Sequence, residues 1–89
     1  MSERFFLYDD VEETRTRFVS FMGEQQRFDL AIINSSRYYG KQLVLDVQSN
    51  RFAIIGSDDL DEPGYIEHAF HLSEEEAAEL RSFLYEIVS

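Results

Sequence analysis

Between Gln42 and Ser57, large apolar residues recur at every second position, first at Leu43, Leu45 and Val47 and then, after a Ser49-Asn50 pair, at Phe52 and Ile54. Such a period on both sides of a two-residue turn signal is typical of a β-hairpin. Asn50 suits the turn because Asn tolerates the positive φ that tight hairpin turns require. This stretch therefore predicts the central hairpin of a sheet.

Three further segments, residues 16–22, 27–34 and 65–72, show the same alternation. They are rich in β-branched and aromatic residues, which favour strands. With the two strands of the hairpin they predict a sheet of about five strands. A shorter apolar run, from Phe5 to Tyr8, is interpreted as an edge strand or as a tail packed on the core.

The end of the chain carries the signals of a helix. Ser73 is followed three residues later by Glu76, which is the spacing of a capping box. After them, apolar residues recur at helical spacing, and they are Ala77, Leu80, Phe83, Leu84, Ile87 and Val88. A helix with one apolar stripe must bury it, and we expect the sheet to provide the surface.

These elements predict an α+β fold, in which an antiparallel β-meander of about five strands has one C-terminal helix packed on one face. The chain has 89 residues and contains no repeat, low-complexity stretch or linker. A length of this order suits one domain. We therefore expect a single domain over residues 1–89.

The strands are apolar on both faces, although one helix covers only one of them. If the alternating set that includes Leu30, Ile32 and Leu43 faces the helix, the other set lines the uncovered face; it comprises Ala31, Ile33, Val44, Ala53 and Ile55, with Val19 and Phe21. An exposed apolar patch usually marks an interface. Dimerisation is one explanation, and a curled sheet or a cover formed by residues 5–8 is the other.

The charge of the chain limits its partners. The net charge is −10, and cysteine is absent. Binding to phosphates of nucleic acid requires clustered cations, so nucleic acid is not an expected partner. The lack of cysteine excludes disulfides, zinc thiolate sites and cysteine nucleophiles. No apolar run approaches the ~20 residues of a membrane span, and no signal peptide is recognised, so we expect a soluble cytoplasmic protein.

The charge is also segregated along the chain. Residues 1–14 contain five acids and one base (−4), residues 15–51 three acids and six bases (+3), and residues 52–89 ten acids and one base (−9). Such an asymmetry suits docking between subunits or with a protein partner. The simpler interpretation is a solvated surface that keeps the protein soluble.

Arg37, Tyr38, Tyr39 and Lys41 form the candidate binding group, because adjacent aromatics between cations are typical of stacking surfaces and of peptide-binding hot spots. Packing of the tyrosines within the fold is the structural alternative. The acidic loop at residues 58–62 is the second candidate recognition surface.

The acidic loop, together with His68 and His71, also invites a metal-binding interpretation. In a strand, residues three apart point to opposite faces, so His68 is expected in the core face and His71 on the surface. The loop lacks the EF-hand pattern, and the chain has no nucleophile elbow, P-loop or dinucleotide motif. We therefore assign no catalytic residue, metal or cofactor, and the sequence favours a protein that is not an enzyme. A small-molecule or metal-binding protein, with an enzyme among the options, is the alternative.

Several segments resemble, in order, a small family of cytosolic Firmicutes proteins described as a domain of unknown function; they are RFFLYDD, TRFVSFMG, RFDLAI, YYGKQLVLDVQS, RFAIIGSDDLDEPGYIEHAF and LSEEEAAEL. The resemblance implies a soluble single-domain bacterial protein and carries over no functional residue. The residues themselves favour a small acidic interaction or regulatory module that forms a homodimer through its sheet or binds another protein.

Overall fold

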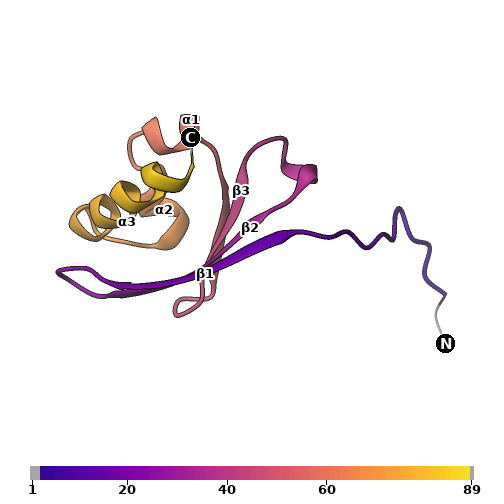
Figure 1. Ribbon diagram of the computed structural model, residues 1–89, viewed down its shortest axis with the longest axis horizontal. Coiled ribbons are helices and arrows are strands. Elements are labelled where there is room, and N and C mark those ends of the chain that lie inside the picture. Colours follow the sequence, from indigo (N-terminus) through magenta and orange to yellow (C-terminus); the bar gives the residue numbers. More distant parts are fainter. Residues whose placement is uncertain (1–2, 89) are drawn as a thin grey trace.

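The computed structural model describes residues 3–88, which form a sheet with helices on one face (Figure 1). The strands are β1 (Arg15–Met22), β2 (Arg27–Asn34), β3 (Gln42–Asp46) and β4 (Arg51–Ile55). The remaining elements are a 3-10 turn, η1 (Ser36–Tyr38), and the helices α1 (Ser57–Asp61), α2 (Tyr65–Phe70) and α3 (Glu74–Ile87). All strand pairs are antiparallel, in the order β1-β2-β3-β4. The predicted α+β meander is confirmed, with four strands rather than about five.

The central hairpin is confirmed as the pairing of β3 with β4. Asp46 pairs with Arg51, and the turn between them ends at Asn50, whose φ is 61°. This left-handed conformation is one that Asn adopts more readily than most residues. The turn contains residues 47–50 rather than only the predicted Ser49-Asn50 pair, so the local sequence located the hairpin and the role of Asn50 but not the length of the turn.

The predicted strand at residues 65–72 is wrong, because this segment forms α2. Ile66 and Phe70 lie four residues apart and are both buried, which is the spacing of one helical face. Gly64 and His71 flank the helix in left-handed conformations, with φ of 80° and 59°. Part of the predicted acidic loop is also helical, since α1 begins at Ser57 and buries Leu60.

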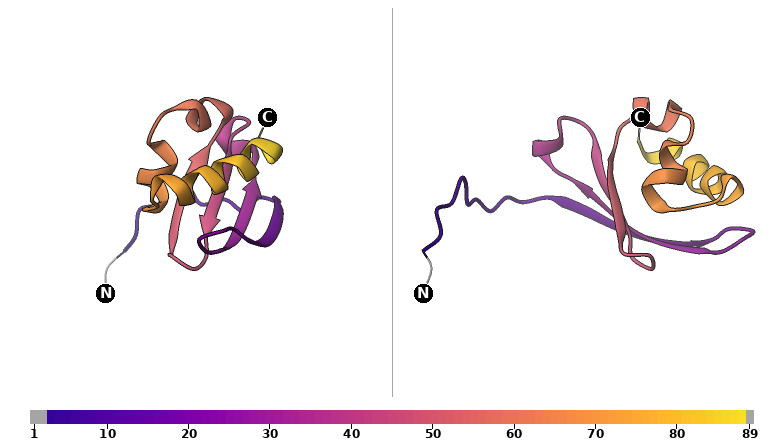
Figure 2. Two further views of the ribbon diagram at one scale, coloured as in Figure 1. Left: turned by 90° about the vertical axis from the view of Figure 1, so that its left-hand side faces the viewer. Right: turned by 180° about the vertical axis from the view of Figure 1, so that it is seen from behind.

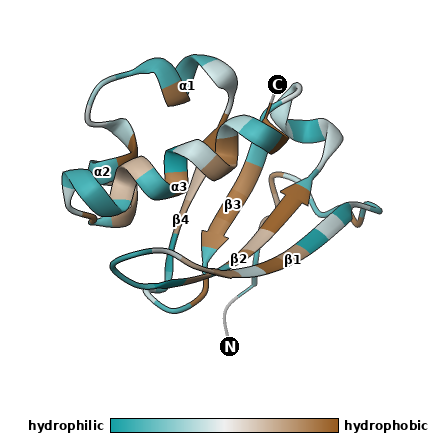
Figure 3. Ribbon diagram, turned by 60° about the vertical axis from the view of Figure 1, so that its left-hand side comes forward, coloured by the Kyte–Doolittle hydropathy of each residue, from teal (hydrophilic) through white to brown (hydrophobic). Residues whose placement is uncertain are grey.

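The helix α3 begins as its capping box predicts. The Ser73 Oγ accepts from the Glu76 N–H at 3.2 Å, and the Glu76 carboxylate accepts from the Ser73 N–H at 2.9 Å. Leu80 and Leu84 on its inner face are fully buried in the core between helices and sheet. Figure 2 shows α3 lying across the strands, and Figure 3 shows the hydrophobic stretches of β2 and β3 beneath the helices.

The two faces of the sheet differ from the prediction on β1, β3 and β4. Residues directly opposite each other in paired strands share a face. Ile32 lies opposite Val44, and Ile33 lies opposite Leu43. The assignment of five residues to the uncovered face is therefore wrong, because they pack in or against the core on the helix side; they are Val19, Phe21, Val44, Ala53 and Ile55. Ala31 and Ile33 do lie on the uncovered face.

The segment before β1 leaves the body of the protein. Figures 1 and 2 show residues 3–14, which we call the N-terminal arm, extending away from the sheet and the helices. The expectation that residues 5–8 form an edge strand or pack on the core is wrong, since Phe5 and Leu7 are 91% and 90% exposed. The arm therefore does not cover the second face of its own sheet.

Candidate functional site

The sheet face opposite the helices carries two adjacent rows of mainly apolar side chains. One row crosses all four strands in register, and it consists of Phe18, Ala31, Leu45 and Phe52. The row beside it consists of Thr16, Ile33, Leu43 and Ile54. We call these two rows the uncovered face. Phe18 on β1 is 79% exposed and Phe52 on β4 is 66% exposed, whereas Ala31 between them is buried, so this surface is most open to solvent on its two edge strands.

The charges beside the uncovered face neutralise each other. Arg27 and Asp29 form an ion pair at 3.1 Å on β2. Arg27 also donates to Ser20, and Gln48 donates to Asp29 at 2.7 Å. All eight residues of the two rows are uncharged. In a chain with a net charge of −10, this face is therefore a neutral surface.

The root of the N-terminal arm is held to η1 by Arg37. This side chain pairs with Asp10 at 2.5 Å and with Glu12 at 2.7 Å, and its guanidinium lies 5.4 Å from the centre of the Tyr8 ring. Ser35 donates a hydrogen bond to Glu12 at 2.7 Å. This hydrogen bond, with the charge of Arg37, lowers the pKa of Glu12. We call these contacts the arm clasp.

The candidate binding group lies around η1, and its two cations are already paired within the chain. Arg37 is part of the arm clasp, and Lys41 pairs with Asp59 at 3.0 Å. Tyr38 is half-buried, whereas Tyr39 is 95% exposed in a left-handed conformation. Partner binding by these four residues stays a prediction.

The acidic segment at residues 58–62 serves mainly the fold. Asp59 accepts from the Gly56 N–H at 2.8 Å and from Lys41, and it thereby caps the start of α1. Burial raises the pKa of Asp59, but these two donors outweigh burial and hold that pKa below its usual value. Asp61 accepts a hydrogen bond from the Tyr85 hydroxyl, which raises the pKa of Tyr85.

The histidines do not form a metal site with these acids. His68 is exposed on α2, so its expected place in the core is wrong, whereas His71 is exposed as expected. Within residues 3–88, no three histidine or acidic side chains are grouped to hold a metal ion. The described part of the chain therefore gives the metal-binding alternative no support.

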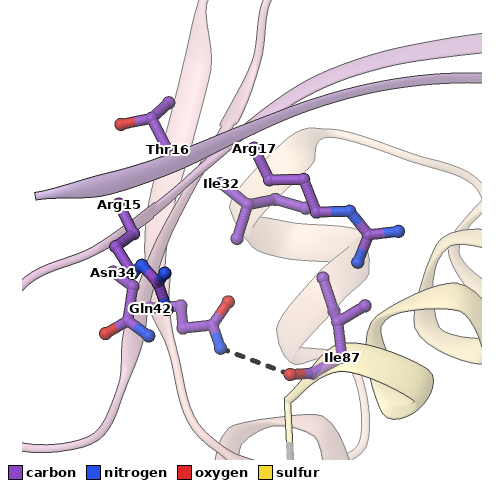
Figure 4. A pocket seen from close by; sticks show the side chains of 7 residues that line it. All are labelled: Arg15, Thr16, Arg17, Ile32, Asn34, Gln42 and Ile87. Carbon is purple, nitrogen blue, oxygen red and sulfur yellow. Dashed lines mark hydrogen bonds between the residues drawn. The ribbon is translucent and has the colours of Figure 1, made fainter.

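A cavity of about 360 Å³ opens at the end of the sheet, on the helix side (Figure 4). The residues that line it are Arg15, Thr16, Arg17, Ile32, Asn34, Gln42 and Ile87. Arg15, Asn34 and Gln42 are opposite one another on β1, β2 and β3, and Ile87 is the last residue of α3. The Gln42 Nε2 donates to the Ile87 carbonyl at 3.2 Å, so sheet and helix are joined at the cavity. We call it the arginine cavity.

The residues of the arginine cavity are not among the candidate site residues predicted from the sequence. Arg15 and Arg17 are two residues apart in a strand, and this spacing puts both side chains on one face. This spacing, together with the excess of bases in residues 15–51, could have indicated that the two arginines form a pair. The sequence could not show that Asn34 and Gln42 also line the cavity, because their position there depends on the pairing of three strands and on where α3 ends.

Among residues 3–88, no helix combines the length and the apolar character that crossing a membrane requires.

Comparisons with known proteins relate this chain to a small family that has no assigned function. A search of curated proteins finds no match. A family model described as SAV0927-like matches residues 7–86, which include the four strands and nearly all of the helical segments. The chain therefore belongs to the SAV0927-like family.

Proposed function

We propose that this protein is a small acidic interaction module that self-associates through the uncovered face, with a second copy of the same chain as the occupant. The observation that carries the proposal is the apolar row from Phe18 to Phe52, which crosses the whole sheet without a covering element. Exposed apolar patches of this kind mark interaction sites in soluble proteins. Two such sheets can stack face to face at about 10 Å, as in β-sandwiches.

The charge distribution favours this face for contact between copies. Two molecules that each carry −10 repel one another, and the repulsion is strongest where acidic surfaces meet. The uncovered face has no net charge, because the Arg27–Asp29 pair is internally neutral. Contact through this face therefore avoids burial of unpaired charge, which is costly.

The available area supports participation of the N-terminal arm. Phe18 and Phe52 expose about 300 Å² together, if a fully exposed Phe contributes roughly 200 Å². A standard interface buries about 800 Å² on each partner. In the arm, Phe5, Phe6 and Tyr8 are 91%, 63% and 70% exposed, and they add about 450 Å² on the same basis. We propose that the arm of each copy packs against the other copy and completes an interface of standard size.

We further propose that the protein acts in the bacterial cytoplasm, as a partner-binding or regulatory component. The resemblance to cytosolic Firmicutes proteins and the absence of cysteine support this placement.

Sedimentation velocity of the wild type and of Phe52→Glu tests the self-association. Phe52 buries at most about 130 Å² on association, which corresponds to about 3 kcal/mol at 25 cal/mol per Å². In a twofold dimer, Phe52 is lost from both copies. We therefore expect the dissociation constant of the Phe52→Glu dimer to be higher than that of the wild type by up to about four orders of magnitude.

Tyr39→Glu is the matched control, because it also replaces an exposed aromatic by a carboxylate but lies outside the uncovered face. We expect Tyr39→Glu to associate like the wild type. A wild type that stays monomeric from about 1 µM to about 1 mM would refute the proposal, since a standard interface associates within that range.

A further inference from the structure

We propose that the arginine cavity binds a small organic anion that carries a carboxylate or phosphate group. The observation is the presence of two guanidinium groups, those of Arg15 and Arg17, in the wall of one cavity. Among residues 3–88, neither side chain forms an ion pair. This inference is independent of the proposed self-association, because the cavity lies on the helix side of the sheet.

The fold brings the two arginines together. They are two residues apart on β1, so both point to the helix side, while Thr16 between them points the other way (Figure 4). Arg17 lies opposite Ile32, and Arg15 lies opposite Asn34. Residues two apart in a strand are separated by about 7 Å, a distance that one small anion can bridge.

Arg15 and Arg17 share one cavity in a chain that is otherwise strongly acidic. Acidic residues outnumber basic ones by 18 to 8, and ion pairs neutralise Arg27, Arg37, Lys41 and Arg81. The arginine cavity receives no such carboxylate from the described residues. Two neighbouring positive charges repel each other, and an anion between them relieves the repulsion. Arginine also binds carboxylate and phosphate through paired hydrogen bonds.

Gln42 and the apolar walls define the rest of the ligand. Because its Nε2 is engaged by the Ile87 carbonyl, Gln42 has its Oε1 available as an acceptor for a donor group of the ligand. Ile32 and Ile87 offer apolar contact. The volume of about 360 Å³ is at the lower end of the range for small-molecule sites. These features suit a compact metabolite with one anionic end.

A structural role for the arginines makes a different prediction. The last turn of α3 borders the cavity and carries a partial negative charge, which nearby cations stabilise. If Arg15 and Arg17 serve only this end of the helix, added anions produce no saturable binding, and loss of the arginines lowers stability.

The test is a titration of the full chain with inorganic phosphate and, separately, with citrate, at an ionic strength held constant with chloride. The Nε–Hε NMR resonances of the arginines report binding at each side chain. We expect saturable shifts at Arg15 and Arg17, and on the order of tenfold weaker binding in Arg15→Gln and in Arg17→Gln. Saturation by phosphate, by citrate or by both supports the proposal and identifies the preferred anionic group.

Arg51→Gln is the matched control, because Arg51 is also exposed and forms no ion pair among residues 3–88, but it borders a different cavity, next to His68 and His71. Shifts that grow linearly without saturation, or an equal loss of binding in Arg51→Gln, would overturn the proposal. Arg15→Lys and Arg17→Lys keep the charge but remove the paired hydrogen bonds, and they replace the Gln variants if those do not fold.

Discussion

Ile54 and Ile55 are neighbours on β4 that point to opposite sides of the sheet, so the pair tests the assignment of the two faces. Ile55 is fully buried in the core, whereas Ile54 is 40% exposed on the uncovered face. Replacing either residue with Ala removes the same atoms and the same β-branched side chain from the same strand. A difference in stability between the variants therefore reports the difference in burial.

We expect Ile55→Ala to lower the free energy of unfolding by about 2–5 kcal/mol, because it leaves a cavity in a packed core. Ile54→Ala leaves no enclosed cavity and is expected to cost about 1 kcal/mol. The assay is urea denaturation followed by circular dichroism at low protein concentration. Since association stabilises a protein by mass action, the cost of Ile54→Ala should increase at high concentration, and that of Ile55→Ala should change less.

The face assignment would be refuted if both variants lost the same free energy of unfolding, or if Ile54→Ala lost more than Ile55→Ala at low protein concentration. The uncovered face would then not be the one formed by Phe18, Leu45 and Phe52, and the proposed interface would lose its basis.

Two further predictions concern local contacts. Ser73→Ala removes the cap of α3 and should lower the free energy of unfolding by about 1 kcal/mol, measured by urea denaturation, whereas Ser82→Ala on the exposed side of α3 should change it little. The folded-state pKa of Glu12 lies below its ordinary value of 4.5, so the arm clasp should be intact above pH 4.5 and should be lost as the pH falls through the folded-state pKa. The Nε–Hε resonance of Arg37 followed against pH measures this release, and the same pH dependence in Glu12→Gln would contradict the role of Glu12.

Sequence patterns were sufficient where a signal is local. The capping box at Ser73 and the apolar stripe through Leu80 and Leu84 predicted α3 correctly, and Asn50 predicted the hairpin turn. In each case the deciding contacts are within a few residues of one another.

The prediction failed where two periods fit the same residues. Between Tyr65 and Leu72, Ile66 and Phe70 are four apart, so both an alternating strand and one face of a helix place them together. An alternating strand would also place His68 on this face, but His68 is exposed in the structure, as the helix α2 allows.

The face assignment and the arginine cavity depend on contacts between distant segments. Residues 42–55 are apolar at both alternating sets of positions, so the pattern did not show which set faces the helices. The pairing of Asn34 with Gln42 across the connection at residues 35–41 decided it. The same pairing brings Gln42 next to Arg15 and Asn34, which sequence spacing alone could not show.

Self-association through the uncovered face can be observed by an isotope-filtered NMR experiment on a mixture of labelled and unlabelled chains, which detects only contacts between copies. We expect intermolecular contacts from the side chains of Phe18, Leu45 and Phe52, and from the aromatic residues of the arm. Intermolecular contacts confined to other surfaces, or their absence at millimolar concentration, would contradict self-association through this face.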